Sequence, residues 1–231
     1  MEQNKLILPL SIIIAGALIG GALYFGNRNS GPTANQNQEN PPAISGEMKP
    51  VSRTEDHILG NPDAPIKLVE YSDTNCPFCR AFHPTMKRIV NEYGENGQVA
   101  WIYRHFSILG PQSITEAEAT ECAAELGGNE KFWQYLDLLF DSKGERARLP
   151  ADITLDGLAE EIGLNVEQFN ACLSSGKYTE RITSSRDDAV SAGAKGTPFT
   201  VLVTEKSMVP INGAQPYENV KDFIEQALRS L

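Results

Sequence analysis

Two cysteines separated by two residues, in the Cys-Pro-Phe-Cys motif at Cys76–Cys79, lie where an apolar strand-like run gives way to a helix-like run. The strand-like run is Ile66–Tyr71 and the helix-like run is Arg80–Glu92. This spacing places both sulfurs on one face of the first helical turn, where they can close into a disulfide. The helix N-terminus there stabilises the thiolate of the first cysteine. The motif therefore favours thiol–disulfide exchange.

The same spacing also fits half of a zinc site or a purely structural disulfide. A zinc site needs further ligands, and the remaining candidates are Cys122, Cys172, His57, His83 and His105. They are scattered along the chain and form no second ligand cluster. We therefore expect no metal ion and no bound cofactor other than the redox-active disulfide.

The first 50 residues differ in composition from the rest of the chain. Leu6–Phe25 is an apolar run of 20 residues without charge, long enough to span a membrane as a helix. It predicts a transmembrane anchor at 1–26 with the C-terminal part outside the cell membrane; the alternative is a cleaved signal peptide ending near Ala15–Ala17. Residues 27–50 are rich in Asn, Gln, Gly and Pro and predict a flexible linker.

From residue 51 onward the hydrophobic pattern is that of a globular domain. It predicts strands at Ile66–Ser72, Val99–Phe106, Pro198–Thr204 and Met208–Asn212. It predicts helices at Cys76–Tyr93, with a kink at Pro84, and at Ser113–Leu126, Glu130–Asp141, Thr154–Ile162, Val166–Ser174, Tyr178–Ala192 and Tyr217–Leu231. The order predicts an α/β fold in which a helical insertion at about 110–193 interrupts a small sheet, with the first two strands parallel.

The net charge of −10 lies entirely on residues 51–231, because the charges of the first 50 residues cancel. A domain this acidic is a poor binder of nucleic acid and is repelled by an anionic membrane surface. The charge favours solubility and identifies no partner.

Several short motifs, in chain order, resemble the DsbA-like extracytoplasmic thiol–disulfide oxidoreductases. They are His57–Pro65, Val69–Asp73, Cys76–Cys79, Phe82–Pro84, Tyr103–Phe106, Lys131–Trp133 and Gly196–Phe199. The resemblance covers roughly residues 55–231. It implies a thioredoxin fold with an inserted α-helical domain, here at 51–231, that exchanges disulfides with exported proteins.

In this interpretation Cys76 is the attacking sulfur, and Cys79, one turn further into the helix, resolves the mixed disulfide. The two residues between them, Pro77 and Phe78, tune the stability of the thiolate. Strongly oxidising members of the family often carry Pro-His, whose imidazole helps to hold the thiolate. Because Phe78 has no such donor, we expect a moderately oxidising centre.

The resemblance identifies Pro198 as a cis-proline that faces the two cysteines and turns the backbone of Thr197 toward a substrate strand. The alternative is a trans proline in an ordinary loop. Glu70 lies inside the apolar strand six residues before Cys76. It is interpreted as a buried acid that exchanges a proton with Cys79; the alternative is a glutamate at an edge, facing solvent.

Cys122 and Cys172 lie on two predicted helices of the insertion. They are candidates for a structural disulfide, which is common in similar proteins, or else are two small buried side chains that never meet. His83 and His105 are expected to pack or to form hydrogen bonds rather than to react. The aromatic side chains are expected in the core of the helical domain: Phe132, Trp133, Tyr135 and Phe140.

The leading hypothesis is a membrane-anchored, extracytoplasmic dithiol oxidase that introduces disulfides into reduced exported proteins. The resemblance implies a quinone-linked membrane partner that reoxidises it. One alternative is a disulfide isomerase or reductase on the same fold, although residues 27–49 are too short and too polar to be a dimerisation domain. The other is a thioredoxin-like module that binds peptides without turnover.

Overall fold

The computed structural model describes residue 44 and residues 46–144 and 146–231. A five-stranded sheet runs through this part of the chain in the order β1-β3-β2-β4-β5. Its strands are β1 (His57–Gly60), β2 (Ile66–Ser72), β3 (Val99–His105), β4 (Phe199–Val203) and β5 (Met208–Asn212). The pairing of β2 with β3 is parallel, as predicted, and the other pairings are antiparallel.

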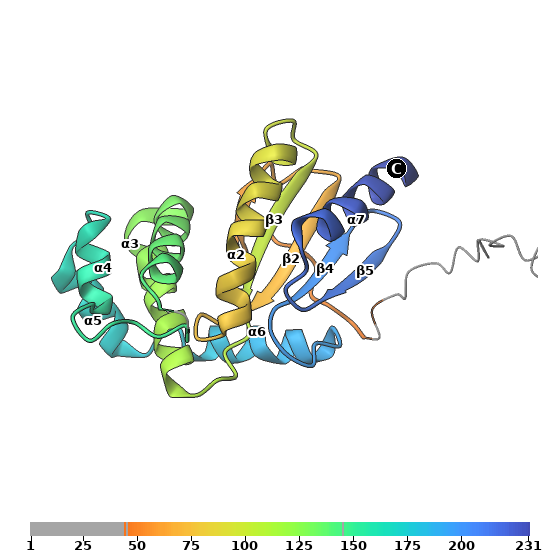
Figure 1. The fold of residues 1–231 in the computed structure, drawn as a ribbon. Coiled ribbons are helices and arrows are strands. Elements are labelled where there is room, and N and C mark those ends of the chain that lie inside the picture. The colour runs from red at the N-terminus through yellow and green to blue at the C-terminus, as the bar shows by residue number, and fades with distance from the viewer. Residues whose placement is uncertain (1–43, 45, 145) are drawn as a thin grey trace, which may run out of the picture. The chain divides into compact units, whose positions relative to one another are not determined.

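Helices cover both faces of the sheet (Figure 1). On one face lie α2 (Pro77–Ile89) and α7 (Tyr217–Ser230), which pack on Leu68 and Trp101. On the other face lies α6 (Thr179–Ser191), which packs through small alanines on strand side chains such as Val69. Because both faces are covered, β2 and β3 are buried along nearly their whole length, and apolar side chains point to both faces of the sheet.

The insertion between β3 and β4 consists of α3 (Pro111–Asp141), α4 (Leu155–Glu161), α5 (Val166–Ser175) and α6. The two helices predicted over residues 113–141 are the two halves of α3, which change direction at Gly128, where φ is +74°. Glycine allows this left-handed backbone without a steric penalty. The helix predicted to run from Cys76 to Tyr93 is α2 followed by a π-helical turn, η1 (Val90–Gly94).

Two predictions about packing are incomplete or wrong. Strand β1 was not predicted; it pairs with β3 along its four residues and closes one edge of the sheet. The aromatic group of α3 was assigned to the core of the helical domain. Only Tyr135 lies there, whereas the other three pack against the sheet and α2: Phe132, Trp133 and Phe140. The second half of α3 lies between the two cores and supplies side chains to both.

Cys122 on α3 and Cys172 on α5 form a disulfide, with their Cα atoms 5.8 Å apart. The bridge lies in the separate core of the insertion, beside Tyr135, Leu158 and Phe169. It joins two helices that are 50 residues apart in sequence.

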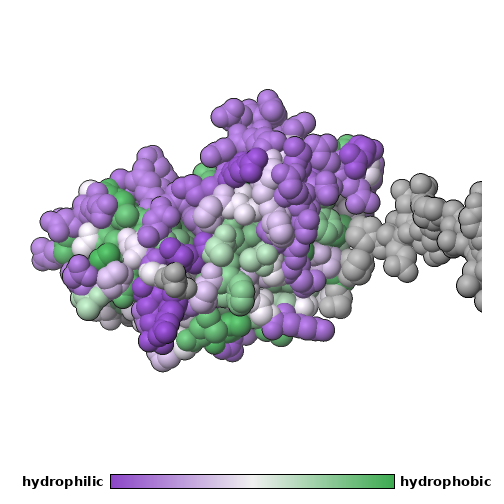
Figure 2. Space-filling model, in the orientation of Figure 1, coloured by the Kyte–Doolittle hydropathy of each residue, from purple (hydrophilic) through white to green (hydrophobic). Residues whose placement is uncertain are grey.

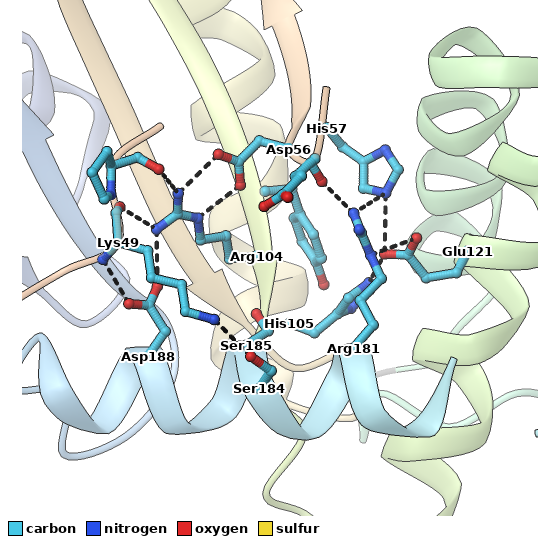
Figure 3. Close-up of a pocket in the computed structure, with 13 residues that line it drawn as sticks. Lys49, Asp56, His57, Arg104, His105, Glu121, Arg181, Ser184, Ser185 and Asp188 are labelled. Atoms are coloured by element: carbon cyan, nitrogen blue, oxygen red, sulfur yellow. Dashed lines mark hydrogen bonds and ion pairs between the residues drawn. The ribbon is translucent and has the colours of Figure 1, made fainter. Parts of the chain in front are cut away.

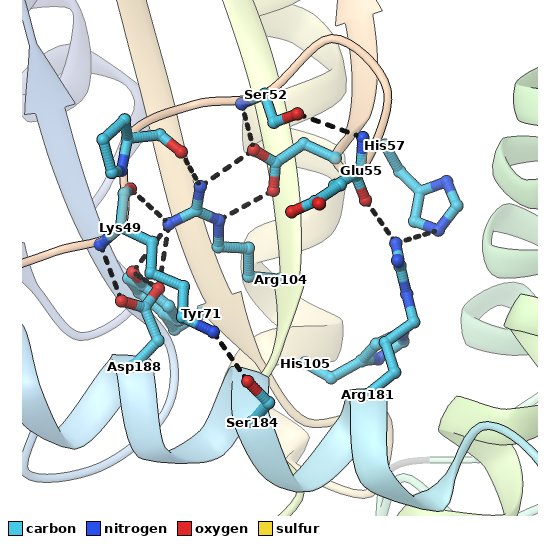
Figure 4. Close-up of polar contacts among 12 residues, drawn as sticks. Lys49, Ser52, Glu55, His57, Tyr71, Arg104, His105, Arg181, Ser184 and Asp188 are labelled. Carbon is cyan, nitrogen blue, oxygen red and sulfur yellow. Dashed lines mark hydrogen bonds and ion pairs between the residues drawn. The ribbon is translucent and has the colours of Figure 1, made fainter.

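A buried arginine fastens the segment that precedes β1 to the sheet and to α6 (Figure 4). The Arg104 guanidinium donates to both carboxylate oxygens of Asp56, each at 2.8 Å, and to Asp188 at 2.9 Å. It also donates to the carbonyl oxygens of Lys49 and Pro50. This two-carboxylate cluster fixes where the chain enters the domain.

The anchor or signal peptide predicted at 1–26 and most of the linker predicted at 27–50 lie outside the described residues. Within the part of the chain that the structure describes, none of the helices combines the length and apolar character needed to cross a membrane.

The disulfide of the insertion should contribute strongly to stability. In a Cys76→Ala/Cys79→Ala background, we expect its reduction to lower the free energy of unfolding by about 4 kcal/mol, because the unfolded chain then loses a closed loop of about 50 residues. Urea unfolding with and without dithiothreitol measures the difference. The variant that also carries Cys122→Ala/Cys172→Ala is the control; a reductant effect of equal size in that control would contradict the assignment.

Candidate active site

The two cysteines of the motif lie at the start of α2, directly beyond the end of β2. Cys76 is the N-cap of the helix and is 5% exposed, whereas Cys79 in the first turn is fully buried. Both are free thiols in this structure. Pro77 occupies the first turn, where its missing N–H leaves no helical hydrogen bond unmade. Phe78 points outward and is 68% exposed. Cys76 is thus the outer sulfur and Cys79 the inner one.

Hydrogen bonds to the sulfur lower the pKa of Cys76 to about 6. The largest contribution comes from the thiol of Cys79; the others come from the Thr197 side chain and the backbone N–H groups of Cys79 and Phe78. These N–H groups belong to the first helical turn and have no partner within the helix. Burial and the neighbouring Cys76 raise the pKa of Cys79 well above its usual value. Near neutral pH the pair therefore consists of an outer thiolate and an inner thiol.

Thr197 and Pro198 lie against the outer sulfur. The peptide bond between them is cis, and the Cys76 sulfur lies 3.4 Å from the carbonyl oxygen of Thr197, to which it donates only when it is protonated. The carbonyl of Pro198 accepts a hydrogen bond from Gly213 at 3.0 Å, which holds the start of β4 in place. The segment Thr197–Pro198 and the start of α2 thus meet at Cys76.

Glu70 is buried in the central strand β2 and is 1% exposed, so the alternative of a solvent-facing glutamate is wrong. Burial raises its pKa to about 7, and the negative charge of Cys76 adds to the shift. Its Oε2 atom has no hydrogen-bond partner among the described residues. Its neighbours across the sheet are Tyr103 on β3 and Thr200 on β4. Glu70 in turn helps to raise the pKa of Cys79, which places the acid and the inner thiol within electrostatic reach.

The loop between β2 and α2 is held by hydrogen bonds that were not predicted. Asp73 Oδ2 accepts from the backbone N–H groups of Ile108 and Leu109, at 2.8 and 3.0 Å. Asp73 Oδ1 accepts from the N–H of Asn75, and its carbonyl accepts from the N–H of Cys76. The Asp-Thr-Asn sequence at residues 73–75 is typical of such side chain–backbone turns, so these hydrogen bonds could have been predicted from it.

Apolar side chains are exposed around this end of the domain. Phe78 lies in the motif itself, and exposed Ile108 and Leu109 belong to the segment that Asp73 binds. Figure 2 shows apolar surface over the start of α2 and the turn after β3. Contiguous exposed apolar surface is typical of a docking site for another molecule.

A second group of polar side chains lines a cavity of about 140 Å³ between α6, α3 and the strand edge (Figure 3). His57 and His105 both contact Glu121 Oε1, at 3.1 and 3.0 Å, and Arg181 contacts Glu121 Oε2 at 2.9 Å. Burial lowers the pKa of His105. These polar groups contact one another and join β1, β3, α3 and α6, so we interpret the cluster as structural.

His83 lies on α2 and bonds Asp137 Oδ1 on α3 at 2.7 Å. The hydrogen-bonding role expected of His83 and His105 is confirmed. Within residues 44, 46–144 and 146–231, no group of three or more His, Cys, Asp and Glu side chains is arranged to hold a metal ion.

The raised pKa of Glu70 makes stability depend on pH. Its pKa is about 7 in the folded protein against 4.5 for the free group, so the stability associated with its protonated form is lost as pH rises from about 4.5 through 7. The loss amounts to roughly 3 kcal/mol. We expect the free energy of unfolding of Glu70→Gln to rise by this amount relative to that of the wild type as the pH goes from 4 to 8. Urea unfolding of the reduced protein measures it. The exposed Glu218→Gln is the control, and a Glu70→Gln difference that stays constant with pH contradicts the interpretation.

Comparisons with known proteins place this geometry in a family. The sequence matches the family described as Thioredoxin over residues 52–226. The Na(+)/H(+) antiporter NhaA 3 of Salinispora tropica is 33% identical over 167 residues, which cover 71% of this chain and 24% of the antiporter. The chain thus spans about a quarter of the length of the antiporters that it matches. The probable disulfide bond formation protein D of Bacillus anthracis is 29% identical over 178 residues, which cover 74% of this chain and 77% of that protein.

Among solved structures, oxidised BdbD from Bacillus subtilis superposes with a TM-score of 0.67 at 22% identity, covering 81% of this chain and 98% of BdbD. This likeness confirms the predicted thioredoxin fold with its helical insertion. The match over residues 52–226 includes both cysteines of the motif and the Thr197–Pro198 segment. The chain therefore belongs to the thioredoxin family, and its similarity to BdbD and to the disulfide bond formation protein agrees with the predicted resemblance to DsbA-like proteins.

Proposed function

We propose that this chain is a dithiol oxidase that introduces disulfides into exported proteins through Cys76 and Cys79. The observation that carries the proposal is the division of the pair into an outer sulfur with a pKa of about 6 and a buried inner thiol. An outer thiolate that is stabilised in the reduced form makes the disulfide form a stronger oxidant, because its reduction then releases free energy.

The reaction would begin with the oxidised enzyme. A substrate thiolate attacks Cys76 Sγ, the bond from Cys76 to Cys79 breaks, and Cys79 leaves with the electron pair and takes up a proton. A second substrate thiolate then attacks the substrate sulfur of the mixed disulfide and releases Cys76 as a thiolate. Two substrate thiols are thereby oxidised to one disulfide, and the enzyme is left as a dithiol.

Glu70 is the group that would supply the proton to Cys79. It is buried within electrostatic reach of Cys79, and a pKa of about 7 leaves it partly protonated at neutral pH. A general acid is most effective when its pKa lies near the working pH. Thr197 would pair with the substrate backbone. Pro198 would keep the Thr197 backbone turned toward Cys76.

The cellular setting is part of the proposal. Residues 1–26 would anchor the chain in a membrane, residues 27–50 would act as a linker, and the domain at 51–231 would work on the extracytoplasmic side. The disulfide between Cys122 and Cys172 supports an oxidising compartment. A quinone-linked membrane protein would reoxidise the enzyme. The name of the Bacillus anthracis relative, a probable disulfide bond formation protein, agrees with this role.

The reduction potential of the Cys76–Cys79 pair tests the proposal. We expect a value clearly above that of thioredoxin, about −270 mV, and stoichiometric oxidation of a reduced, unfolded substrate protein. Cys76→Ser should abolish this activity, whereas Cys122→Ala/Cys172→Ala should retain it in the folded fraction. A potential at or below the thioredoxin value argues for a reductase. Refolding of a scrambled substrate without net oxidation argues for an isomerase, and peptide binding that survives Cys76→Ser argues for a binding module.

Phe78 offers a way to change the potential without disturbing the fold, because its side chain is 68% exposed. We expect Phe78→His to lower the pKa of Cys76 and to raise the potential by about 30 mV, since an imidazole can donate to the thiolate. Equilibration with glutathione measures the change. Phe78→Leu, which adds no donor, is the matched control, and an equal shift in both variants would contradict the explanation.

A further inference from the structure

A lysine of the insertion is buried against the loop that precedes Cys76. Lys143 follows the C-terminal end of α3, and its side chain is 0% exposed. Its Nζ donates to the carbonyl oxygen of Thr74 at 2.9 Å, to Asn75 Oδ1 at 3.3 Å and to Glu116 Oε2 at 2.5 Å. A fully buried lysine is rare in proteins unless it is paired. Two of its three partners are the residues directly before the nucleophile.

Glu116, on the first half of α3, contacts the same two residues. Its Oε2 accepts from Thr74 Oγ1 at 2.5 Å and from Asn75 Nδ2 at 3.1 Å. Its Oε1 accepts from Gln112 Nε2 at 3.0 Å. Both charged groups of this pair are therefore bound to residues 74 and 75, and both come from the insertion.

Two carboxylates, Glu116 and Asp73, lie near the single positive charge of Lys143. Glu116 contacts it directly, and Asp73 is near enough to act on it electrostatically. Burial lowers the pKa of Lys143, and these two carboxylates oppose that effect. Lys143 thus compensates negative charge next to the position where Cys76 must itself become an anion.

We propose that Lys143 is a positioning residue for thiol–disulfide exchange at Cys76, an inference that rests on the proposed function. Its ammonium fixes the Thr74 carbonyl and the Asn75 side chain, so that the N–H groups of Phe78 and Cys79 remain directed at the Cys76 sulfur. Without it the Thr74 carbonyl and the Asn75 side chain lose a hydrogen-bond donor, and Glu116 loses its counter-charge. Both changes make the Cys76 thiolate less stable.

The experiment measures the rate of iodoacetamide alkylation of Cys76 against pH in the reduced, full chain, with mass spectrometry to confirm the site. We expect Lys143→Met to move the midpoint of the profile upward and to lower the rate at pH 6 about threefold. The control is Asp137→Asn, which removes a different ion pair between α3 and α2, formed with His83 and Lys87. This control should lose stability and keep the wild-type profile.

A Lys143→Met profile that superimposes on the wild type overturns the proposal, even when the variant is less stable. Because Lys143→Met leaves Glu116 buried and unpaired, that variant is at risk of unfolding. Lys143→Met/Glu116→Met replaces the pair by apolar side chains and removes this risk. If the shift persists in the double variant, the loss of the hydrogen bond from Lys143 to the Thr74 carbonyl is responsible. If the double variant returns to the wild-type profile, the effect is the charge of Glu116 alone and positioning by Lys143 is wrong.

The readout separates this inference from the proposed function. Alkylation reports the reactivity of Cys76 and requires no substrate protein. A wild-type chain that fails to oxidise substrates, yet shows the expected dependence on Lys143, contradicts the oxidase proposal and leaves the positioning role standing. The reverse result contradicts only the role of Lys143.

Discussion

The stabilisation of a sulfur anion at the start of α2 is the interaction on which the chemistry of this domain depends. The N–H groups of the first turn have no helical partners, and Cys76 is placed to accept from them. This arrangement works only while the preceding backbone stays fixed. The hydrogen bonds of Asp73 to Ile108 and Leu109 hold this backbone in place.

The two cysteines differ because they face different surroundings over a single helical turn. Cys76 meets backbone donors and the Thr197 segment, which favour its charged form. Cys79 lies on the buried, apolar side of α2, where burial, the neighbouring Cys76 and the charge of Glu70 favour its neutral form. The same burial keeps Glu70 from ionising fully at neutral pH. In the proposed mechanism this buried carboxyl group would supply a proton, and when ionised it opposes charge on the inner sulfur.

Local features of the sequence were sufficient for the parts of the site that lie on one segment. The spacing of Cys76 and Cys79 and the apolar run before them gave the strand–helix junction, and the resemblance gave Thr197 and Pro198. The burial of Glu70 could not be decided in this way, because it depends on β2 lying in the middle of the sheet. Lys143 was missed for a similar reason: its partner Glu116 is 27 residues away, and the Thr74 carbonyl is 69 residues away. Periodicity also cannot tell which of two cores a helix face meets, so the aromatic residues of α3 were assigned to the wrong one.

Two of the buried ion-pair clusters in the described part of the domain hold different parts of the structure together. Arg104, with Asp56 and Asp188, ties the entering chain to α6 on the sheet face that does not carry the motif helix α2. Lys143 and Glu116 tie the insertion to Thr74 and Asn75, which directly precede Cys76. Replacing a buried pair by apolar side chains is often neutral or favourable for stability, so stability alone does not account for pairs of either kind. Arg104 holds the segment before β1 in place through the Lys49 and Pro50 carbonyls and Asp56. Lys143 holds the backbone beside a reacting atom, where a small displacement changes the chemistry before it changes the fold.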